Sequence, residues 1–225
     1  MPLRLAFFDL DGTLKRERDP YIYLHRRLGT WDACQLYLAQ GLAGELDYDE
    51  WLRRDVGLWQ GTSLATIEDL LRQNPYLPGA RETVASLVEA GVQVALVSTG
   101  LDLHAALVQQ ELGAQRAYAN QVVVREGLIS GEARTLVREG GKGQIVRQVQ
   151  AELDVPPEDC LAVGDGSSDA DMFALVRFGI AVNAPSERLR AAAHVVIEEA
   201  DLHDVLPMLE ALAPGWMPVG RGNHR

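Results

Sequence analysis

The sequence has few of the residues that mark an exported or membrane-bound protein. Its 225 residues include only two cysteines, Cys34 and Cys160. Because these two lie in different predicted segments, they fit buried thiols better than a disulfide. No run approaches the roughly 20 apolar residues that cross a bilayer, and no signal-peptide pattern opens the chain. We therefore expect a cytoplasmic protein that does not contact membranes.

Positive charge is also scarce, since 21 Lys and Arg residues face 32 Asp and Glu residues, for a net charge of -11. Such a field repels polyanions, so nucleic acid is not expected as a partner. A small phosphorylated metabolite needs only a locally positive site. The length and the 47% of hydrophobic residues allow one ordinary domain with a small second one. Nothing in the sequence indicates an oligomeric state.

Short buried-strand patterns alternate with helical patterns along most of the chain. Apolar runs without polar alternation, typical of strands buried on both faces, lie at Leu3–Phe8, Val92–Ser98, Cys160–Gly164 and Phe178–Val182, with a shorter one at His194–Ile197. Helical patterns lie at Ala80–Ala90, Leu103–Leu112, Gln144–Leu153 and Asp169–Arg177. This alternation predicts an α/β fold, with a Rossmann-like parallel sheet and helices on both faces.

Residues 15–77 contain only helical patterns, at Tyr21–Leu28, Asp32–Ala43, Asp49–Leu58 and Leu64–Gln73. We expect a small helical cap domain here, inserted after the first strand, and an α/β core domain of residues 1–14 and 78–213. Most aromatic residues of the insertion are expected to close its small core, and one or two to line a cleft. Ala117–Ser130 fits a β-hairpin, and residues 214–225 fit a flexible tail.

Polar side chains follow several strands of the predicted sheet. They are Asp9 and Asp11 after the first strand, Ser98 and Thr99 after the second, Asp165 and Asp169 after a later one, and Lys142 at the start of the helix that leads into that later strand. Ligands of parallel α/β sheets bind beyond the carboxyl ends of the strands. We therefore expect these side chains to converge at one edge.

These residue types suit metal-assisted phosphoryl transfer. Two or three carboxylates form a hard oxygen site for Mg²⁺, which commonly takes one or two carboxylates together with a substrate phosphate. Lys142 and the amides of Thr99 and Gly100 are placed to hold phosphate oxygens. In this interpretation Asp9 attacks phosphorus and forms an acyl phosphate, and Asp11 acts as the general acid and base.

Each segment has a simpler interpretation when taken alone. The aspartate pair at residues 9–13 and the stretch "GDGSSD" at residues 164–169 fit turns. Ser98 and Thr99 fit a helix N-cap, and Lys142 fits a solvated lysine, although a cation opposes the dipole at a helix start. Four such segments at four strand or helix ends together favour a functional site.

The order of these motifs resembles a known family. "DLDGT", "VST", a later lysine and "GDGSSD", with a helical insertion after the first, resemble the four motifs of the haloacid dehalogenase superfamily of Mg²⁺-dependent phosphatases. The resemblance implies the following roles: Asp9 as nucleophile, Asp11 as general acid and base, Ser98 as phosphate ligand, Lys142 as charge stabiliser, and Asp9, the Asp11 carbonyl and Asp165 as metal ligands supported by Asp169.

The stretches "AYANQVVVREGLISGE" and "VGDGSSDADMF" resemble the phosphoserine phosphatase branch of that superfamily. The branch usually has serine where Gly12 stands and asparagine where Ser168 stands, and it binds the amino acid through a cap glutamate and a cap arginine. Counted without gaps, Arg54 takes the arginine's place, while Arg18 takes the glutamate's place, one residue after Glu17. We expect a phosphatase of small phosphomonoesters, with Glu17 and Arg54 as candidate substrate ligands and phosphoserine as a candidate substrate.

Two other functions remain open at this point. A phosphomutase or phosphotransferase would use the same aspartyl-phosphate chemistry, and a non-catalytic binding protein can share the fold. A P-loop is not supported, because the lysine of "GGKG" lacks a glycine six residues earlier and a following serine or threonine.

Overall fold

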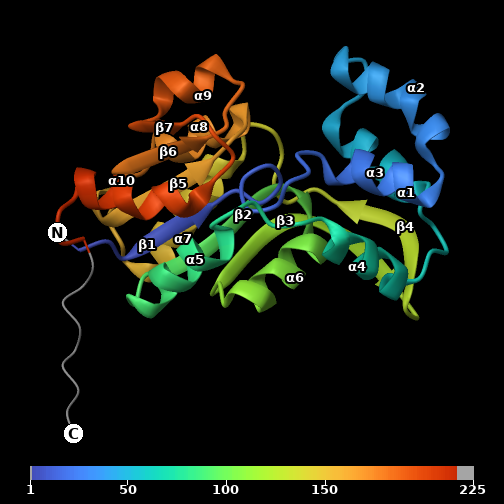
Figure 1. Cartoon of the computed structure of the whole chain (residues 1–225). Helices are drawn as coiled ribbons and strands as arrows, with labels where there is room; N and C mark the ends of the chain where they lie inside the picture. The colour runs from blue at the N-terminus through green and yellow to red at the C-terminus, as the bar shows by residue number, and fades with distance from the viewer. Residues whose placement is uncertain (1, 217–225) are drawn as a thin grey trace, which may run out of the picture.

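The computed structural model describes residues 2–216 of the chain. Its centre is one seven-stranded sheet with the order β4-β3-β2-β1-β5-β6-β7 (Figure 1). The strands are β1 (Leu5–Phe8), β2 (Gln93–Leu101), β3 (Arg116–Arg125), β4 (Leu128–Arg134), β5 (Cys160–Gly164), β6 (Phe178–Val182) and β7 (Val195–Ile197). Every neighbouring pair is parallel except β3 and β4. The predicted α/β fold is confirmed.

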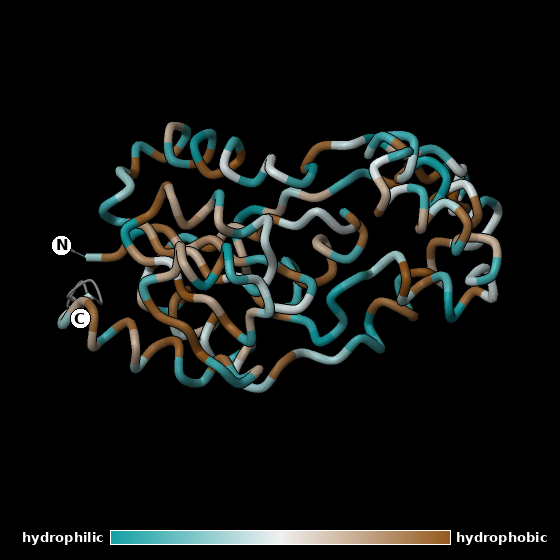
Figure 2. Tube along the Cα trace, turned by 90° about the horizontal axis from the view of Figure 1, so that it is seen from above, coloured by the Kyte–Doolittle hydropathy of each residue, from teal (hydrophilic) through white to brown (hydrophobic). Residues whose placement is uncertain are grey.

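Both faces of the sheet are apolar. Successive strand residues point to opposite sides, so a strand made only of apolar residues supplies both faces. In β1, Phe8 packs in one hydrophobic cluster and Phe7 in the other. The first cluster includes α5 (Ala80–Glu89), α6 (Asp102–Leu112) and α10 (Val205–Leu212), and the second includes α7 (Lys142–Leu153), α8 (Ala170–Phe173) and α9 (Glu187–Ala192). Figure 2 shows brown, hydrophobic stretches running through the inside of the molecule, while the outer coils alternate between hydrophobic and hydrophilic residues.

The four helices predicted between the first two strands are present as α1 (Pro20–Leu28), α2 (Trp31–Leu42), α3 (Tyr48–Gly57) and α4 (Leu64–Gln73). Side-chain caps fix the starts of α1, α3 and α4. In α1, Asp19 accepts a hydrogen bond from the amide of Ile22, and Pro20 occupies the first turn, where a missing N–H has no cost. These helices lie together at one end of the molecule (Figure 1). We propose that residues 15–77 act as a cap on a core of residues 1–14 and 78–213.

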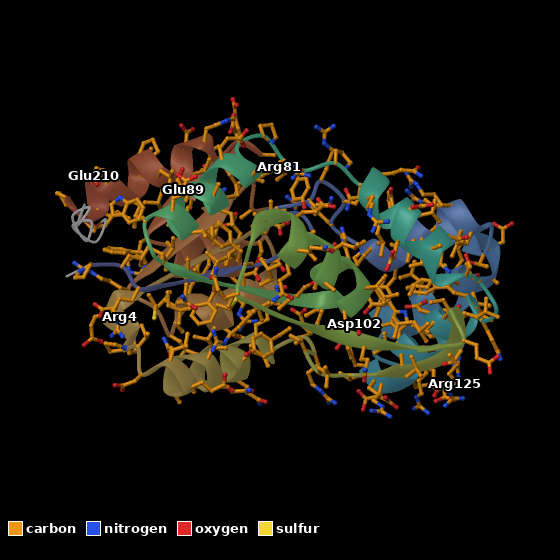
Figure 3. The ribbon with its side chains drawn as sticks, turned by 90° about the horizontal axis from the view of Figure 1, so that it is seen from below. Arg4, Arg81, Glu89, Asp102, Arg125 and Glu210 are labelled. Carbon is orange, nitrogen blue, oxygen red and sulfur yellow. The ribbon has the colours of Figure 1, made fainter. Side chains whose placement is uncertain are left out.

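The predicted hairpin is longer than expected and continues the main sheet. Its turn is Glu126 and Gly127, both with positive φ, as a two-residue hairpin turn requires, and β3 pairs with β2 in parallel. In Figure 3, Arg125 lies at the end of the molecule with the helical segment, far from Arg4. The hairpin supplies Val122 and Ile129 to the apolar cluster of that segment, which therefore shares its core with the sheet.

Two local expectations were wrong, and two helices were missed. Strand β2 runs to Leu101 and α6 begins at Asp102, so Ser98 and Thr99 lie inside the last part of a strand and do not cap a helix. The helix expected over Asp169–Arg177 is a 3-10 turn followed by the four residues of α8, because the chain must reach the start of β6 at Phe178. Helices α9 and α10 were not expected.

The end of the described chain is packed against the sheet. Trp216 is buried, and its carbonyl accepts a hydrogen bond from the amide of Leu3 at 3.1 Å. The start of the predicted flexible tail is therefore structured as far as Trp216, and residues 217–225 lie outside the described part. Within residues 2–216, no helix combines the length and the apolar character needed to cross a membrane.

Candidate active site

The site begins where β1 ends. The amide of Asp9 still donates to the Val163 carbonyl of β5 at 3.0 Å, so the Asp9 side chain stands on the rigid sheet edge. The chain then turns at Gly12, whose φ is 91°. A Cβ atom here would lie less than 3.0 Å from the carboxylate of Asp165. Glycine at position 12 therefore lets the first loop approach the loop after β5.

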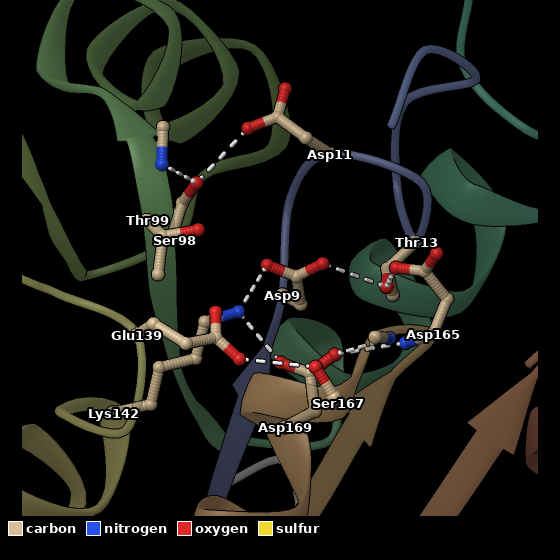
Figure 4. A network of polar contacts seen from close by, with 12 residues as sticks. Asp9, Asp11, Thr13, Ser98, Thr99, Glu139, Lys142, Asp165, Ser167 and Asp169 are labelled. Carbon is tan, nitrogen blue, oxygen red and sulfur yellow. Dashed lines mark hydrogen bonds and ion pairs between the residues drawn. The ribbon is translucent and has the colours of Figure 1, made fainter. Parts of the chain in front are cut away.

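Lys142 lies between two of the predicted carboxylates. Its Nζ donates to Asp9 Oδ1 at 2.5 Å and to Asp169 Oδ1 at 2.6 Å, and Figure 4 shows the three side chains meeting. Burial alone would lower the pKa of Lys142, but the charges of Asp169 and Asp9 raise this pKa well above its usual value. The interpretation of Lys142 as a solvated lysine was wrong: it is a buried cation at the active edge.

A cluster of oxygens from Asp9, Asp165 and Asp169 fits a divalent cation. One oxygen of each lies within 4.8 Å of the others, and all three residues are buried. Burial and the charges of Asp9 and Asp169 raise the pKa of Asp165 to about 8, and burial and the Asp9 charge raise the pKa of Asp169 to about 6. Crowded carboxylates of this kind need a further positive charge, and an all-oxygen donor set suits Mg²⁺.

Both side-chain oxygens of Asp169 already accept hydrogen bonds, so this residue supports the cluster more than it offers a free oxygen to a metal ion. Its Oδ1 accepts from Lys142, and its Oδ2 accepts from the amides of Asp165 and Gly166 at 3.0 and 2.9 Å. The Thr13 hydroxyl, which the sequence did not single out, lies 3.1 Å from Asp9 Oδ2 and 3.0 Å from Asp165 Oδ1. Thr13 thus links the first and last motifs.

These pKa shifts predict that stabilisation by Mg²⁺ grows with pH. With raised pKa values, Asp165 and Asp169 bind protons in the folded, metal-free protein that the unfolded chain, with a pKa near 3.8, has released. The free energy of unfolding of the metal-free protein therefore falls as pH rises from about 4 to about 8. Because Mg²⁺ binds ionised carboxylates, the rise in Tm on adding it should be small at pH 5 and large at pH 8.5.

Thermal melts at both pH values, with and without saturating Mg²⁺, measure this increment. An Asp165→Asn variant serves as the control and should lose most of the increment at pH 8.5. An equal increment at both pH values would contradict a site built on these carboxylates.

Asp11 is held by both of its oxygens. Its Oδ2 accepts from the Ser98 hydroxyl at 3.0 Å and its Oδ1 lies 2.9 Å from Nδ1 of His104, while the Gly100 amide donates to Ser98 Oγ at 2.8 Å. Figure 4 shows Asp11 turned toward Ser98. A Cβ on Gly100 would meet the Asp11 carboxylate, so glycine is needed here. No pattern in the sequence singles out His104, which is a lone histidine in a helical pattern.

Thr99 lies beside the site and ties several elements together. Its carbonyl accepts from the hydroxyls of Tyr21 and Tyr48 at 3.2 and 3.0 Å and from Nδ2 of Asn120 at 2.7 Å. The Asn120 Oδ1 in turn accepts from the amides of Leu136 and Val137, both at 2.9 Å. The Thr99 carbonyl of β2 thereby joins α1, α3 and β3. Asn120 extends this link to the segment before Lys142.

A cavity of about 490 Å³ lies over these groups. Its lining includes Asp9, Asp11, Ser98, Thr99, Gly100, Lys142, Asp165, Ser168 and Asp169 together with residues of α1, α2 and α3. The structure thus brings together every predicted site residue outside the cap. Three aromatic residues of the helical segment line the cavity, Tyr21, Tyr48 and Trp51, where one or two were expected.

The two predicted cap ligands do not line this cavity. Glu17 is exposed, and Arg54 is exposed with its Nε 2.8 Å from Glu50. Their neighbours in the chain line it instead: Arg18, whose Nη1 lies 3.2 Å from Asp165 Oδ2, and Asp55. Neighbouring side chains of a helix point about 100° apart. The ungapped count that selected Arg54 therefore did not identify Asp55, the residue of α3 that faces the cavity.

Comparisons with known proteins agree with this geometry. Residues 6–174 match the haloacid dehalogenase-like hydrolases. The phosphoserine phosphatase of Methanocaldococcus jannaschii is 28% identical over 208 residues, which is 92% of this chain and 98% of that protein. That of Wolinella succinogenes is 30% identical over 208 residues, 92% of this chain and 100% of that protein. Some other relatives are longer, and the chain spans 50% of their length.

A solved structure gives the same result. A phospho-aspartyl intermediate analogue of phosphoserine phosphatase superposes with a TM-score of 0.78 at 29% identity, over 92% of this chain and 99% of that chain.

Proposed function

Because the chain belongs to the haloacid dehalogenase-like hydrolase family, we propose that it hydrolyses a small phosphomonoester through a phosphorylated Asp9 in a Mg²⁺-dependent reaction. The observation that carries this proposal is the position of Asp9. Its carboxylate lies between Lys142, at 2.5 Å, and the hydroxyl of Thr13, at 3.1 Å, at the floor of the cavity. A carboxylate beside a buried cation is placed to meet a phosphoryl dianion.

In the first step the Asp9 carboxylate attacks the phosphorus atom. The new bond joins an Asp9 oxygen to phosphorus while the bond from phosphorus to the alcohol oxygen breaks. Asp11 donates a proton to that leaving oxygen, so the alcohol departs neutral. The hydroxyl of Ser98 and the charge of Lys142 hold the phosphoryl oxygens as negative charge shifts among them.

In the second step water regenerates the enzyme. Asp11, now ionised, takes a proton from a water molecule, whose oxygen attacks the phosphorus of the acyl phosphate. The bond between phosphorus and Asp9 breaks, which releases inorganic phosphate and restores the Asp9 carboxylate. The sheet edge holds Asp9 in place through both steps.

The metal site would be formed by the side chains of Asp9 and Asp165 and the carbonyl of Asp11, with Asp169 as their support. When bound there, Mg²⁺ would offset the repulsion between these carboxylates and the phosphate group. The donor set and the raised pKa values of Asp165 and Asp169 support this assignment.

The relatives named above make phosphoserine a candidate substrate, and a cytoplasmic location stays a prediction. Glu17 and Arg54 also stay predicted ligands, although their neighbours Arg18 and Asp55 line the cavity and they do not. A phosphomutase or phosphotransferase would pass through the same phosphorylated Asp9.

Release of inorganic phosphate from a panel of monoesters tests the proposal. We expect steady release with Mg²⁺ and none after chelation. If release occurs only with a bisphosphate activator, the protein is a mutase; if no ester is hydrolysed with Mg²⁺, the assignment as a phosphatase is wrong.

A further inference from the structure

The cavity continues beyond the catalytic carboxylates into a chamber with apolar walls. Ile22 of α1, Leu38 and Leu42 of α2, and Trp51 and Leu52 of α3 line it. A Cβ on Gly41 would lie less than 3.0 Å from the Trp51 ring, so the missing side chain lets α2 pack directly on this indole. The wall is thus held in place by packing between two helices.

This chamber offers no free cation for a substrate carboxylate. Of the basic side chains that line the cavity in the described part of the chain, Arg18 contacts Asp165 and the Asn183 carbonyl, and Lys142 is bound by its two aspartates. The third basic side chain is His25, whose Nδ1 accepts from Trp59 Nε1 at 3.1 Å. A ring nitrogen that accepts carries no proton, and Nε2 faces Asp55 at 3.0 Å, so His25 has no free N–H for a substrate carboxylate.

The chamber does hold acidic groups. Asp55 lies 3.0 Å from His25 Nε2, and Asp19 accepts from the amide of Ile22 at 2.9 Å; both carboxyls line the cavity. Their charge would repel a substrate carboxylate, because charges interact strongly where water is excluded. Burial raises the pKa of both residues, which agrees with a chamber poor in water.

We infer that the alcohol portion of the substrate is bulky, mostly apolar and free of a carboxylate, so that phosphoserine is a poor substrate. This inference rests on the proposed phosphatase function. The cavity of about 490 Å³ has the size of sites for ligands much larger than an amino acid. Apolar walls gain affinity from the apolar area they cover.

Three alkyl esters with similar leaving oxygens provide the test: 2-phenylethyl phosphate, ethyl phosphate and phosphoserine. We expect kcat/KM for 2-phenylethyl phosphate to exceed that for phosphoserine by at least about 10-fold, the scale of one or two apolar contacts in a pocket. Equal or better hydrolysis of phosphoserine overturns the inference and leaves the phosphatase function standing. Failure to hydrolyse all three would overturn the proposed function itself.

A matched pair of variants on α2 locates the chamber. Leu38→Ala should lower kcat/KM for 2-phenylethyl phosphate about 5-fold or more relative to ethyl phosphate, through lost apolar contact. Leu36, on the same helix, is 73% exposed, and Leu36→Ala should leave that ratio unchanged. An unchanged ratio in Leu38→Ala, or equal changes in both variants, would contradict binding against this wall.

An independent observation concerns His104. A hydroxyl group has one proton, so when Ser98 donates to a phosphoryl oxygen it no longer donates to Asp11. The contact to His104 Nδ1, at 2.9 Å, then remains. His104 is almost fully buried, and its Nε2 has no partner in the described structure. A buried N–H without an acceptor is costly, so the ring proton lies on Nδ1 and is donated to Asp11.

We propose that His104 is a positioning residue that keeps the Asp11 carboxyl group directed at the leaving oxygen. A general acid must lie within hydrogen-bond reach of the atom it protonates. Residues that orient a catalytic group through its second oxygen typically change activity by about 10- to 100-fold, as they do around metal ligands. His104 does not touch the substrate in this proposal.

Leaving-group dependence separates positioning from a structural role. The constant kcat/KM reports the first, irreversible transfer to Asp9, and p-nitrophenyl phosphate needs no proton from Asp11 in that step. We expect His104→Leu to lower kcat/KM about 10-fold or more for an alkyl ester and much less for p-nitrophenyl phosphate. His104→Asn, whose amide can replace Nδ1–H, should recover most of the alkyl activity. Equal losses for both esters, or no loss for the alkyl ester, would overturn the proposal.

Discussion

Asp9→Asn is expected to lower Mg²⁺-dependent phosphate release by about 10³-fold or more, because a neutral amide cannot attack phosphorus. The substitution is nearly isosteric at a residue in contact with Lys142 and Thr13. It also removes one charge from the crowded cluster with Asp165 and Asp169, so the free energy of unfolding of the metal-free protein should not fall strongly. Loss of activity with an intact fold is therefore the expected combination.

Phosphate release and mass spectrometry of acid-quenched protein measure this result. The wild type should carry a covalent phosphoryl group during turnover and the variant none. Asp69→Asn, the same change at an exposed position of α4, is the matched control and should behave as the wild type does. Activity within about 10-fold of the wild type in Asp9→Asn would rule out Asp9 as the nucleophile.

Lys142→Met should affect both stability and activity. Lys142 is the buried cation between Asp9 and Asp169, and removing one member of a buried ion pair typically costs about 3–5 kcal/mol. The remaining carboxyl groups would bind protons more tightly in the folded variant. The loss in the free energy of unfolding should therefore be smaller at pH 5 than at pH 8, because protonated carboxyl groups need no counter-charge.

Urea unfolding at both pH values, with and without Mg²⁺, measures this loss. Mg²⁺ should return part of the stability at pH 8, since it supplies positive charge to the same cluster. Lys142→Arg keeps the charge and should retain more stability than Lys142→Met, but a planar guanidinium does not reproduce the two contacts of a compact ammonium group, so activity should stay low. A loss that does not depend on pH would contradict the electrostatic explanation.

Much of the fold followed from the sequence, because buried parallel strands and amphipathic helices have distinct periodicities. β5 and β6 were predicted to the residue. The failures have identifiable causes. α9 is six residues long and buries only Leu189, so it has no period to detect. The packing of Trp216 depends on the distant Leu3 amide, which no local pattern reports.

The catalytic edge could be predicted because its residues come from strand ends and one helix start, where topology fixes their position. Asp9, Lys142 and Asp165 belong to this group. Cap residues are harder, since a count along the sequence does not show which side chains of α3 face the cavity: Asp55 lines it, and Arg54 pairs with Glu50. His104 required knowing that α6 packs beside Asp11.

The three donors on the Thr99 carbonyl have a consequence for how ligands enter and leave. Tyr21 and Tyr48 come from α1 and α3 and meet the same oxygen atom. Lifting either helix alone would leave the other attached to Thr99. If ligand exchange requires α1 and α3 to move, both phenols must leave the same oxygen atom, and this single event would then limit the rate of exchange whatever the speed of the chemistry at Asp9.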